Sequence, residues 1–273
     1  AAPPAAPAEP APAAAAPEAA AASPAAPEPT PEPEPAAEPE PETPRVVLSP
    51  EPEPAAEPAT AQAEPGLAGL AAYRQPFEAP ADKPLLSIVL LGADRSTIDA
   101  ALSFGAPVAV AAAPGPEAAA IASAAHDAGL EALSAGPLEG LGEAGPVIGA
   151  VFGAAATPTQ AALDEIGAGG WAMLDIGFEG GGPVYRAARS KGLPAAPLGR
   201  RIDRDAAADL VFFSLDFAAL EARQRGAAVA VGAATPSVIA GVRRWIAVKG
   251  GEGVAVVPLS AVIDRLAGDG GTR

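Results

Sequence analysis

The chain contains one histidine, His126, and no cysteine among its 273 residues. Zinc sites, activated nucleophiles and most proton relays in proteins are built from these two residue types. A metal site made of several histidines is therefore excluded by the inventory of side chains alone. A site made only of carboxylates remains open, because the chain carries 33 aspartates and glutamates.

Three further absences each exclude a class of protein. The 17 basic residues form no stripe that could neutralise nucleic-acid phosphates, so we expect no nucleic-acid partner. No run of about 18 apolar residues occurs, so no segment is predicted to span a membrane. Gly92 follows the first predicted strand without the two further glycines of a dinucleotide fingerprint, and neither G-x-x-x-x-G-K-[ST] nor G-x-S-x-G occurs. These patterns argue against a pyrophosphate site and a serine nucleophile.

Residues 1–66 consist almost entirely of alanine, proline and glutamate. They hold 20 of the 34 prolines and 12 of the 33 acidic residues, and with Arg45 as their only base they carry −11 of the net charge of −16. Alanine buries too little surface to offset the entropy of ordering the chain, and the frequent prolines prevent a continuous helix. We therefore predict a disordered Pro/Ala/Glu-rich linker over residues 1–83, extended at about 3 Å per residue.

The N-terminus suggests a cellular location. The chain starts at Ala1 and not at methionine, which suits removal of an N-terminal signal or anchor. A long tether directly after such an element suits a protein that is periplasmic, or anchored in the inner membrane and facing the periplasm. We expect membrane contact only through that missing anchor. The lack of cysteine is compatible with an oxidising compartment and does not require one.

Residues 84–266 alternate short apolar runs with amphipathic stretches, and a flexible tail is predicted over residues 267–273. Eight apolar runs, from residues 85–91 to residues 253–257, predict strands, and most are separated by predicted helices, the longest over residues 205–225. Residues 85–91 are continuously apolar, as in a central parallel strand. The pattern predicts one parallel α/β domain, in which a distorted barrel competes with an open doubly wound sheet.

Candidate site residues lie where predicted strands end, because sites in parallel α/β folds form at the carboxyl edge of the sheet. Asp175 ends one strand, Glu179 follows it in a glycine-rich loop, and Asp94 follows the first strand. With Arg201 they are the candidate groove residues. A helix-capping role is an equally good interpretation of Asp94 and Asp175, because aspartate is a natural cap after a strand-to-helix turn. His126 has no motif partner and is interpreted as a surface helix residue.

Several stretches carry a resemblance to a known family. In chain order they are residues 87–90, 122–131, 171–175 and 226–236, and then Trp245 followed by residues 256–260. In order and spacing they resemble the divergent polysaccharide deacetylases, relatives of the NodB-type carbohydrate esterases, over about residues 84–263. The resemblance implies a distorted parallel (β/α) barrel. It also implies metal-assisted deacetylation, in which a divalent ion polarises the acetyl carbonyl and activates water.

The chain departs from that family where the chemistry would lie. Positions that carry the family's Asp-Asp pair, two histidines and metal motif here hold apolar or small residues: Leu91, Gly92, Ala135, Ala233 and 151–156. Asp175 is the retained acidic position. The resemblance therefore implies a lost metal site, no cofactor and no confident catalytic residue.

We predict a pseudoenzyme that binds peptidoglycan, another envelope glycan or an envelope protein through the old substrate groove. Two alternatives stay open. One is an active carbohydrate deacetylase or hydrolase that uses carboxylates, and the other is a purely structural scaffold on a tether.

Overall fold

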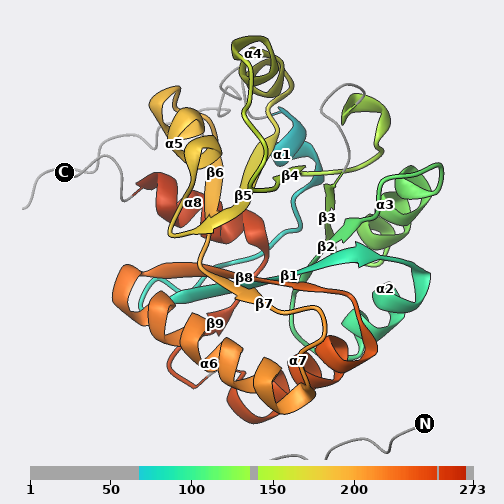
Figure 1. The fold of residues 1–273 in the computed structure, drawn as a ribbon, viewed down its shortest axis with the longest axis vertical. Helices are drawn as coiled ribbons and strands as arrows, with labels where there is room; N and C mark the ends of the chain where they lie inside the picture. The colour runs from blue at the N-terminus through green and yellow to red at the C-terminus, as the bar shows by residue number, and fades with distance from the viewer. Residues whose placement is uncertain (1–67, 136–140, 251, 269–273) are drawn as a thin grey trace, which may run out of the picture. The chain divides into compact units, whose positions relative to one another are not determined.

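The computed structural model describes residues 68–135, 141–250 and 252–268 (Figure 1). Over these residues nine strands form one sheet, in which all paired strands are parallel. The strands are β1 (Leu85–Ala93), β2 (Ala109–Ala112), β3 (Glu131–Ser134), β4 (Gly149–Phe152), β5 (Ala172–Glu179), β6 (Ala195–Leu198), β7 (Arg200–Ile202), β8 (Ala227–Ala233) and β9 (Ala255–Val256). Their order is β6-β5-β4-β3-β2-β1-β8-β7, and β9 pairs with β1 outside this path.

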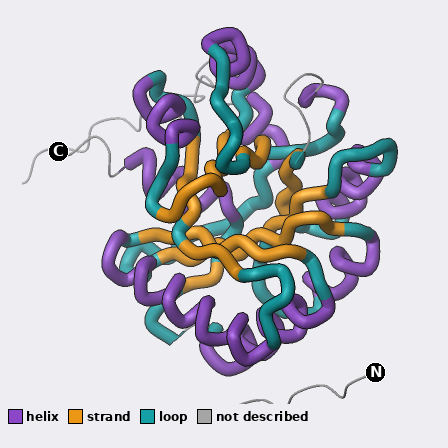
Figure 2. Tube along the Cα trace, in the orientation of Figure 1, coloured by secondary structure: helices purple, strands orange, loops and turns teal. Residues whose placement is uncertain are grey.

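Helices follow most of the strands and surround the sheet (Figure 2). They are α1 (Ala68–Tyr73), α2 (Arg95–Leu102), α3 (Ala118–Asp127), α4 (Gln160–Gly169), α5 (Pro183–Ser190), α6 (Ala208–Arg225), α7 (Pro236–Lys249) and α8 (Leu259–Gly268), with a single 3-10 turn at Leu141–Glu143. None of the helices within the described ranges is long and apolar enough to cross a membrane.

The sheet closes almost completely because β6 and β7, which are consecutive in the chain, pair with strands at opposite ends of the strand order. β6 pairs with β5, and after Gly199 the chain continues as β7, which pairs with β8. The Gly199 amide donates to the Val229 carbonyl at 2.9 Å, and a Cβ on Gly199 would lie only 3.0 Å from that oxygen. The predicted distorted parallel barrel is therefore confirmed, and the open doubly wound sheet is not the fold of this chain.

Two hydrophobic clusters occupy the two faces of the sheet. Along β1, Leu86, Ile88 and Leu90 belong to the cluster that includes residues of the outer helices, and Leu85 and Val89 belong to the other. This second cluster is rich in alanine from the strands and also contains buried residues of α8. β9 pairs with the first residues of β1, so α8, which follows it, lies at the amino-terminal end of the barrel. The opposite end, where the strands finish, carries the candidate residues.

Packed structure extends N-terminal of residue 84. In α1, Leu70 is buried, and its amide donates to the Gly170 carbonyl at 2.8 Å. The linker predicted for residues 1–83 therefore has ordered contacts over its last part, because Leu70 finds a place in the core. Residues 1–67 and 269–273 lie outside the described residues, and the linker and tail stay predictions there.

Candidate functional site

β5 and β7 bring three of the four candidate residues together. Asp175 lies within β5, Glu179 is its last residue, and Arg201 lies in β7. The Arg201 amide donates to Glu179 Oε1 at 3.2 Å, and the Arg201 guanidinium donates to the Ile176 carbonyl. Two segments more than twenty residues apart in the chain are thus joined near the carboxyl ends of their strands.

Asp175 is buried and holds neighbouring backbone segments in place through its carboxylate. Its side chain is 1% exposed. One carboxylate oxygen accepts from the Gly177 amide at 2.9 Å, and the other accepts from the amides of Gly182 at 3.0 Å and Tyr185 at 2.9 Å. Gly182 is the N-cap of α5 and has no side chain to serve as an acceptor, so Asp175 supplies the acceptor from the strand. The carboxylate thereby fixes the end of β5, the turn that follows it and the start of α5.

β5 extends through Glu179, which the sequence analysis placed in a loop, and the ends of β5 and β7 present exposed groups of three chemical kinds. Phe178 is 52% exposed, and Glu179 is exposed beside it. Glu179 Oε2 lies 3.7 Å from Nη1 of Arg200, a loose ion pair. Arg201 is also exposed, so the ends of β5 and β7, which the Arg201–Glu179 hydrogen bond joins, carry an aromatic ring, a carboxylate and a guanidinium. The sequence analysis did not name Phe178 or Arg200 as site residues. For Phe178 the sequence offered one signal, an aromatic residue in a polar, glycine-rich stretch. For Arg200 it offered none.

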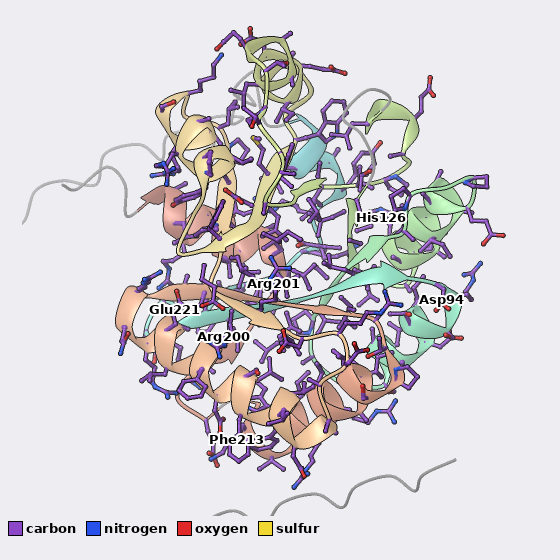
Figure 3. All side chains as sticks on the ribbon, in the orientation of Figure 1. Asp94, His126, Arg200, Arg201, Phe213 and Glu221 are labelled. Atoms are coloured by element: carbon purple, nitrogen blue, oxygen red, sulfur yellow. The ribbon has the colours of Figure 1, made fainter. Side chains whose placement is uncertain are left out.

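Asp94 lies apart from this group, at the end of β1 (Figure 3). It is the N-cap of α2, where it accepts from the Thr97 amide and from the hydroxyls of Ser96 and Thr97, each at 2.8 Å. The Ser96 hydroxyl and the Thr97 hydrogen bonds lower the pKa of the Asp94 carboxyl below its ordinary value. This is the capping alternative of the sequence interpretation, and its groove role stays a prediction.

The carboxyl ends of the strands do not fit the divalent ion that the family resemblance implies. Leu91, Ala135, Val151 and Ala233 lie at or just after strand ends and are partly exposed, but none has a side-chain donor atom. Across the described ranges, no group of three or more His, Asp or Glu side chains is placed to hold a metal ion. We therefore derive no step through a metal, and its absence from the protein stays a prediction.

His126 belongs to a different cluster. Its Nδ1 lies 3.2 Å from Gln75 Nε2, and its ring meets the Tyr73 ring edge-on at 5.8 Å between centroids. The nearby Glu131 is buried and accepts from Ser260 in α8, a contact that the sequence interpretation missed. Desolvation raises the pKa of the Glu131 carboxyl, although hydrogen bonds from Ser260 and Gln75 oppose it. This cluster attaches α8 to the barrel.

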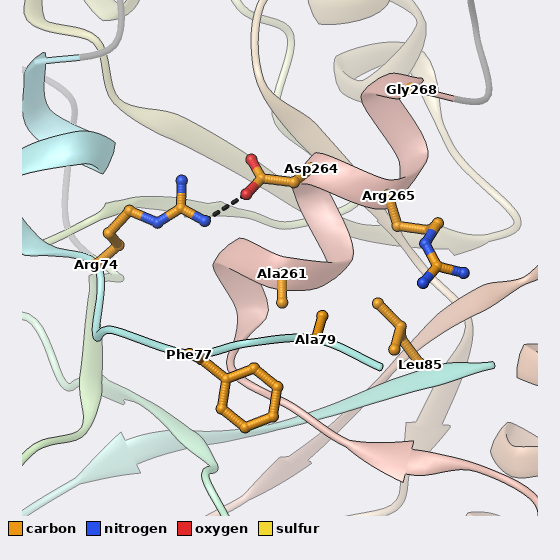
Figure 4. A pocket seen from close by; sticks show the side chains of 8 residues that line it. All are labelled: Arg74, Phe77, Ala79, Leu85, Ala261, Asp264, Arg265 and Gly268. Carbon is orange, nitrogen blue, oxygen red and sulfur yellow. Dashed lines mark hydrogen bonds and ion pairs between the residues drawn. The ribbon is translucent and has the colours of Figure 1, made fainter. Parts of the chain in front are cut away.

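A hollow of about 360 Å³ lies beside α8 at the same end of the barrel (Figure 4). Arg74 and Asp264 form an ion pair across it, and Phe77 lines it. None of the candidate residues lines this hollow. The candidate site therefore remains the surface formed by Phe178, Glu179 and Arg201.

Residues 146–263, which contain both β5 and β7, match the family described as divergent polysaccharide deacetylase. Over this range the chain is similar to that family. The divergent deacetylase match thus includes Asp175, Glu179 and Arg201, whereas Asp94 lies outside it. No curated protein gives a significant match.

Two solved structures resemble the deacetylase-like chain. An uncharacterized protein from Agrobacterium tumefaciens C58 aligns with a TM-score of 0.59 at 20% identity, over 71% of this chain and 94% of that one. A family 4 carbohydrate esterase from Streptomyces lividans, in complex with acetate, aligns with a TM-score of 0.37 at 16% identity, over 66% of this chain and 100% of that one. At such identities, the first comparison supports a shared fold only.

Proposed function

We propose that this divergent deacetylase-like domain binds a glycan strand of the bacterial envelope, with peptidoglycan as the first candidate, and does not deacetylate it. One observation carries the proposal. The strand ends keep an ordered carboxylate and guanidinium, Glu179 and Arg201, while positions that resemble the family's ligand positions hold side chains such as Leu91 and Ala233. A site of this composition can hold a sugar but has no means of fixing a metal ion.

The exposed groups suit a polysaccharide ligand. Sugar hydroxyls both donate and accept hydrogen bonds, and a carboxylate beside a guanidinium offers both partners in charge-assisted form. Glu179 Oε1 is already engaged by the Arg201 amide, but Oε2 has only the loose Arg200 contact and is available to a ligand. The half-exposed Phe178 ring offers an apolar face on which a sugar ring can lie.

Composition supports the proposed envelope location. The acidic, proline-rich composition of residues 1–66 predicts an extended spacer, which suits a domain that reaches a cell-wall ligand. A tethered binding domain gains effective concentration near its ligand, so modest affinity suffices.

We expect Glu179→Ala and Arg201→Ala each to weaken binding to purified peptidoglycan about 5- to 50-fold, because each removes a charge-assisted hydrogen bond of roughly 1–2.5 kcal/mol. Phe178→Ala should weaken it similarly. Co-sedimentation with insoluble sacculi, analysed as a binding isotherm, measures the effect. Glu165→Ala, at an exposed position in α4, is the matched control and should bind as the wild type does. Unchanged binding in all three site variants would refute the proposed site.

A further inference from the structure

One face of α6 carries an exposed apolar stripe. Its residues lie three, four and three positions apart, which is the spacing of a coiled-coil seam. All four side chains are large, apolar and about half exposed: Leu210 (59%), Phe213 (59%), Phe217 (58%) and Leu220 (44%). The buried face of the same helix is formed by other residues, among them Val211 and Leu215. The stripe is therefore not the face that attaches α6 to the barrel.

The stripe lies beside a gap in the outer helical layer. In a regular (β/α) barrel a helix follows every strand, but between β6 and β7 only Gly199 intervenes. Hollows of about 440 Å³ and 240 Å³ lie along α6 next to this segment, and Phe217 lines both of them. The guanidinium of Arg200, in β7, lies 5.3 Å from the centre of the Phe217 ring. The surface here is shaped to receive another helix.

We propose that α6 pairs with α6 of a second copy of this chain, antiparallel, about a twofold axis between Phe213 and Phe217. In that arrangement Leu210 lies opposite Leu220 of the second copy, and Phe213 lies opposite Phe217. A twofold interface must be complementary to itself. The stripe meets this condition because its two halves have the same pattern, with one leucine at each end and a phenylalanine toward the middle.

The charges at the two ends of the stripe are also self-complementary. The amino end is acidic on balance: Asp203 and Asp205 lie on either side of Arg204 just before α6, and Asp209 is in its first turn. Arginines lie at the carboxyl end, at Arg223 and Arg225. Antiparallel pairing places the acidic end of each copy against the basic end of the other.

Some of these charges already have partners within the chain. Asp209 pairs with Arg244, and Arg225 pairs with Glu221 at 2.6 Å. All of these pairs are at least partly exposed, so they can be shared with a second copy at the rim of an interface. The same charge order also suits the dipole of α6 by itself. The test must therefore reverse the charges at one end of α6 and then restore opposite charges by mixing two complementary variants.

The size of the stripe sets the expected strength. Four large side chains that are about half exposed offer roughly 400 Å² per copy, about half of the ~800 Å² per partner in a standard interface. An apolar patch of this size matches the largest patch on a typical monomer, which is often functional, and an interface of this size is weak. We therefore expect a dimer that forms at micromolar concentrations and dissociates on dilution. The 240 Å³ hollow is also lined by Glu179, so this surface adjoins the proposed glycan site, although the dimer is inferred without reference to glycan binding.

Sedimentation velocity of the full chain between about 1 and 200 µM tests the dimer. The wild type should shift from monomer to dimer over this range. The double variant Phe213→Asp with Phe217→Asp should sediment as a monomer throughout, with an unchanged circular dichroism spectrum. Val248→Asp, at a 55% exposed position in α7, is the control and should dimerise as the wild type does. A wild type that stays monomeric, or a stripe variant that still dimerises, overturns the proposal.

Charge reversal tests the antiparallel arrangement separately. One variant carries Arg223→Asp with Arg225→Asp, and another carries Asp205→Arg with Asp209→Arg. Each alone should lose self-association, because like charges would meet at both ends of the interface. An equimolar mixture should form a heterodimer, because opposite charges then meet at both ends. A mixture that stays monomeric contradicts the antiparallel pairing.

Discussion

Glu131→Ala is expected to lower the free energy of unfolding by about 3–4 kcal/mol, a large effect for a single side chain. Glu131 is 1% exposed and accepts from the Ser260 amide at 2.9 Å, from the Ser260 hydroxyl, and from the Gln75 amide at 3.3 Å. Truncation leaves these donors without their acceptor at about 1–3 kcal/mol each, partly offset by removal of a buried carboxylate, and opens a cavity. Urea unfolding followed by circular dichroism measures the loss. Glu165→Ala should change stability by less than about 0.5 kcal/mol.

The same residue gives stability a pH dependence of known sign. Burial raises the pKa of Glu131 above its ordinary value of 4.5, so the folded state holds this proton more tightly than the unfolded state. The resulting stabilisation is fully present below pH 4.5 and is lost as the pH rises through the folded pKa. Glu131→Gln cannot titrate, so the difference in unfolding free energy, wild type minus Glu131→Gln, should fall as the pH rises above 4.5. A difference that stays constant or rises with pH would contradict the account of Glu131.

Asp175→Ala is expected to cost about 3 kcal/mol, because it leaves the amides of Gly177, Gly182 and Tyr185 without their shared acceptor. Thermal and urea unfolding measure the loss. Asp99→Ala, on the exposed face of α2, is the control and should be nearly neutral.

The Asp175 variant also distinguishes a residue that positions the site from a residue that touches the ligand. We expect its affinity for peptidoglycan to fall, because the end of β5 and the turn after it lose their anchor and Phe178 and Glu179 lose their alignment. Glu179→Ala should lower affinity at unchanged stability. If Asp175→Ala binds as tightly as the wild type while it loses stability, residues 177–182 are not part of the ligand site.

The order of elements was largely predictable because each depends on local pattern. The apolar run of β1 and the long α6 both occur close to their predicted positions. β7 was missed because Arg200 and Arg201 give no strand pattern; its strand form comes from pairing with β8 after the chain turns at Gly199. Closure of the barrel at that point is a tertiary event with no local signal.

The candidate site was predictable only in part. Parallel strands place their carboxyl ends at one edge, and this rule identified Asp175 and Glu179. It could not decide between capping and ligand contact, because both roles place an aspartate after a strand. The contact of Glu131 with Ser260 spans 129 residues, so nothing in the local sequence points to it. The exposed stripe on α6 was hidden for a similar reason, since the helix has apolar residues on two faces and only the fold shows which face is buried.

The most direct measurement on this domain is acetate release from N-acetylated chitooligosaccharides and peptidoglycan, with added Zn²⁺, Mn²⁺ or Mg²⁺ and with chelator. The preparation should first be shown to bind sacculi, so that an inactive sample is not mistaken for a binding protein. A domain that binds its glycan without turning it over should release no acetate above the protein-free control under any of these conditions. Metal-dependent acetate release that increases with protein concentration would contradict it.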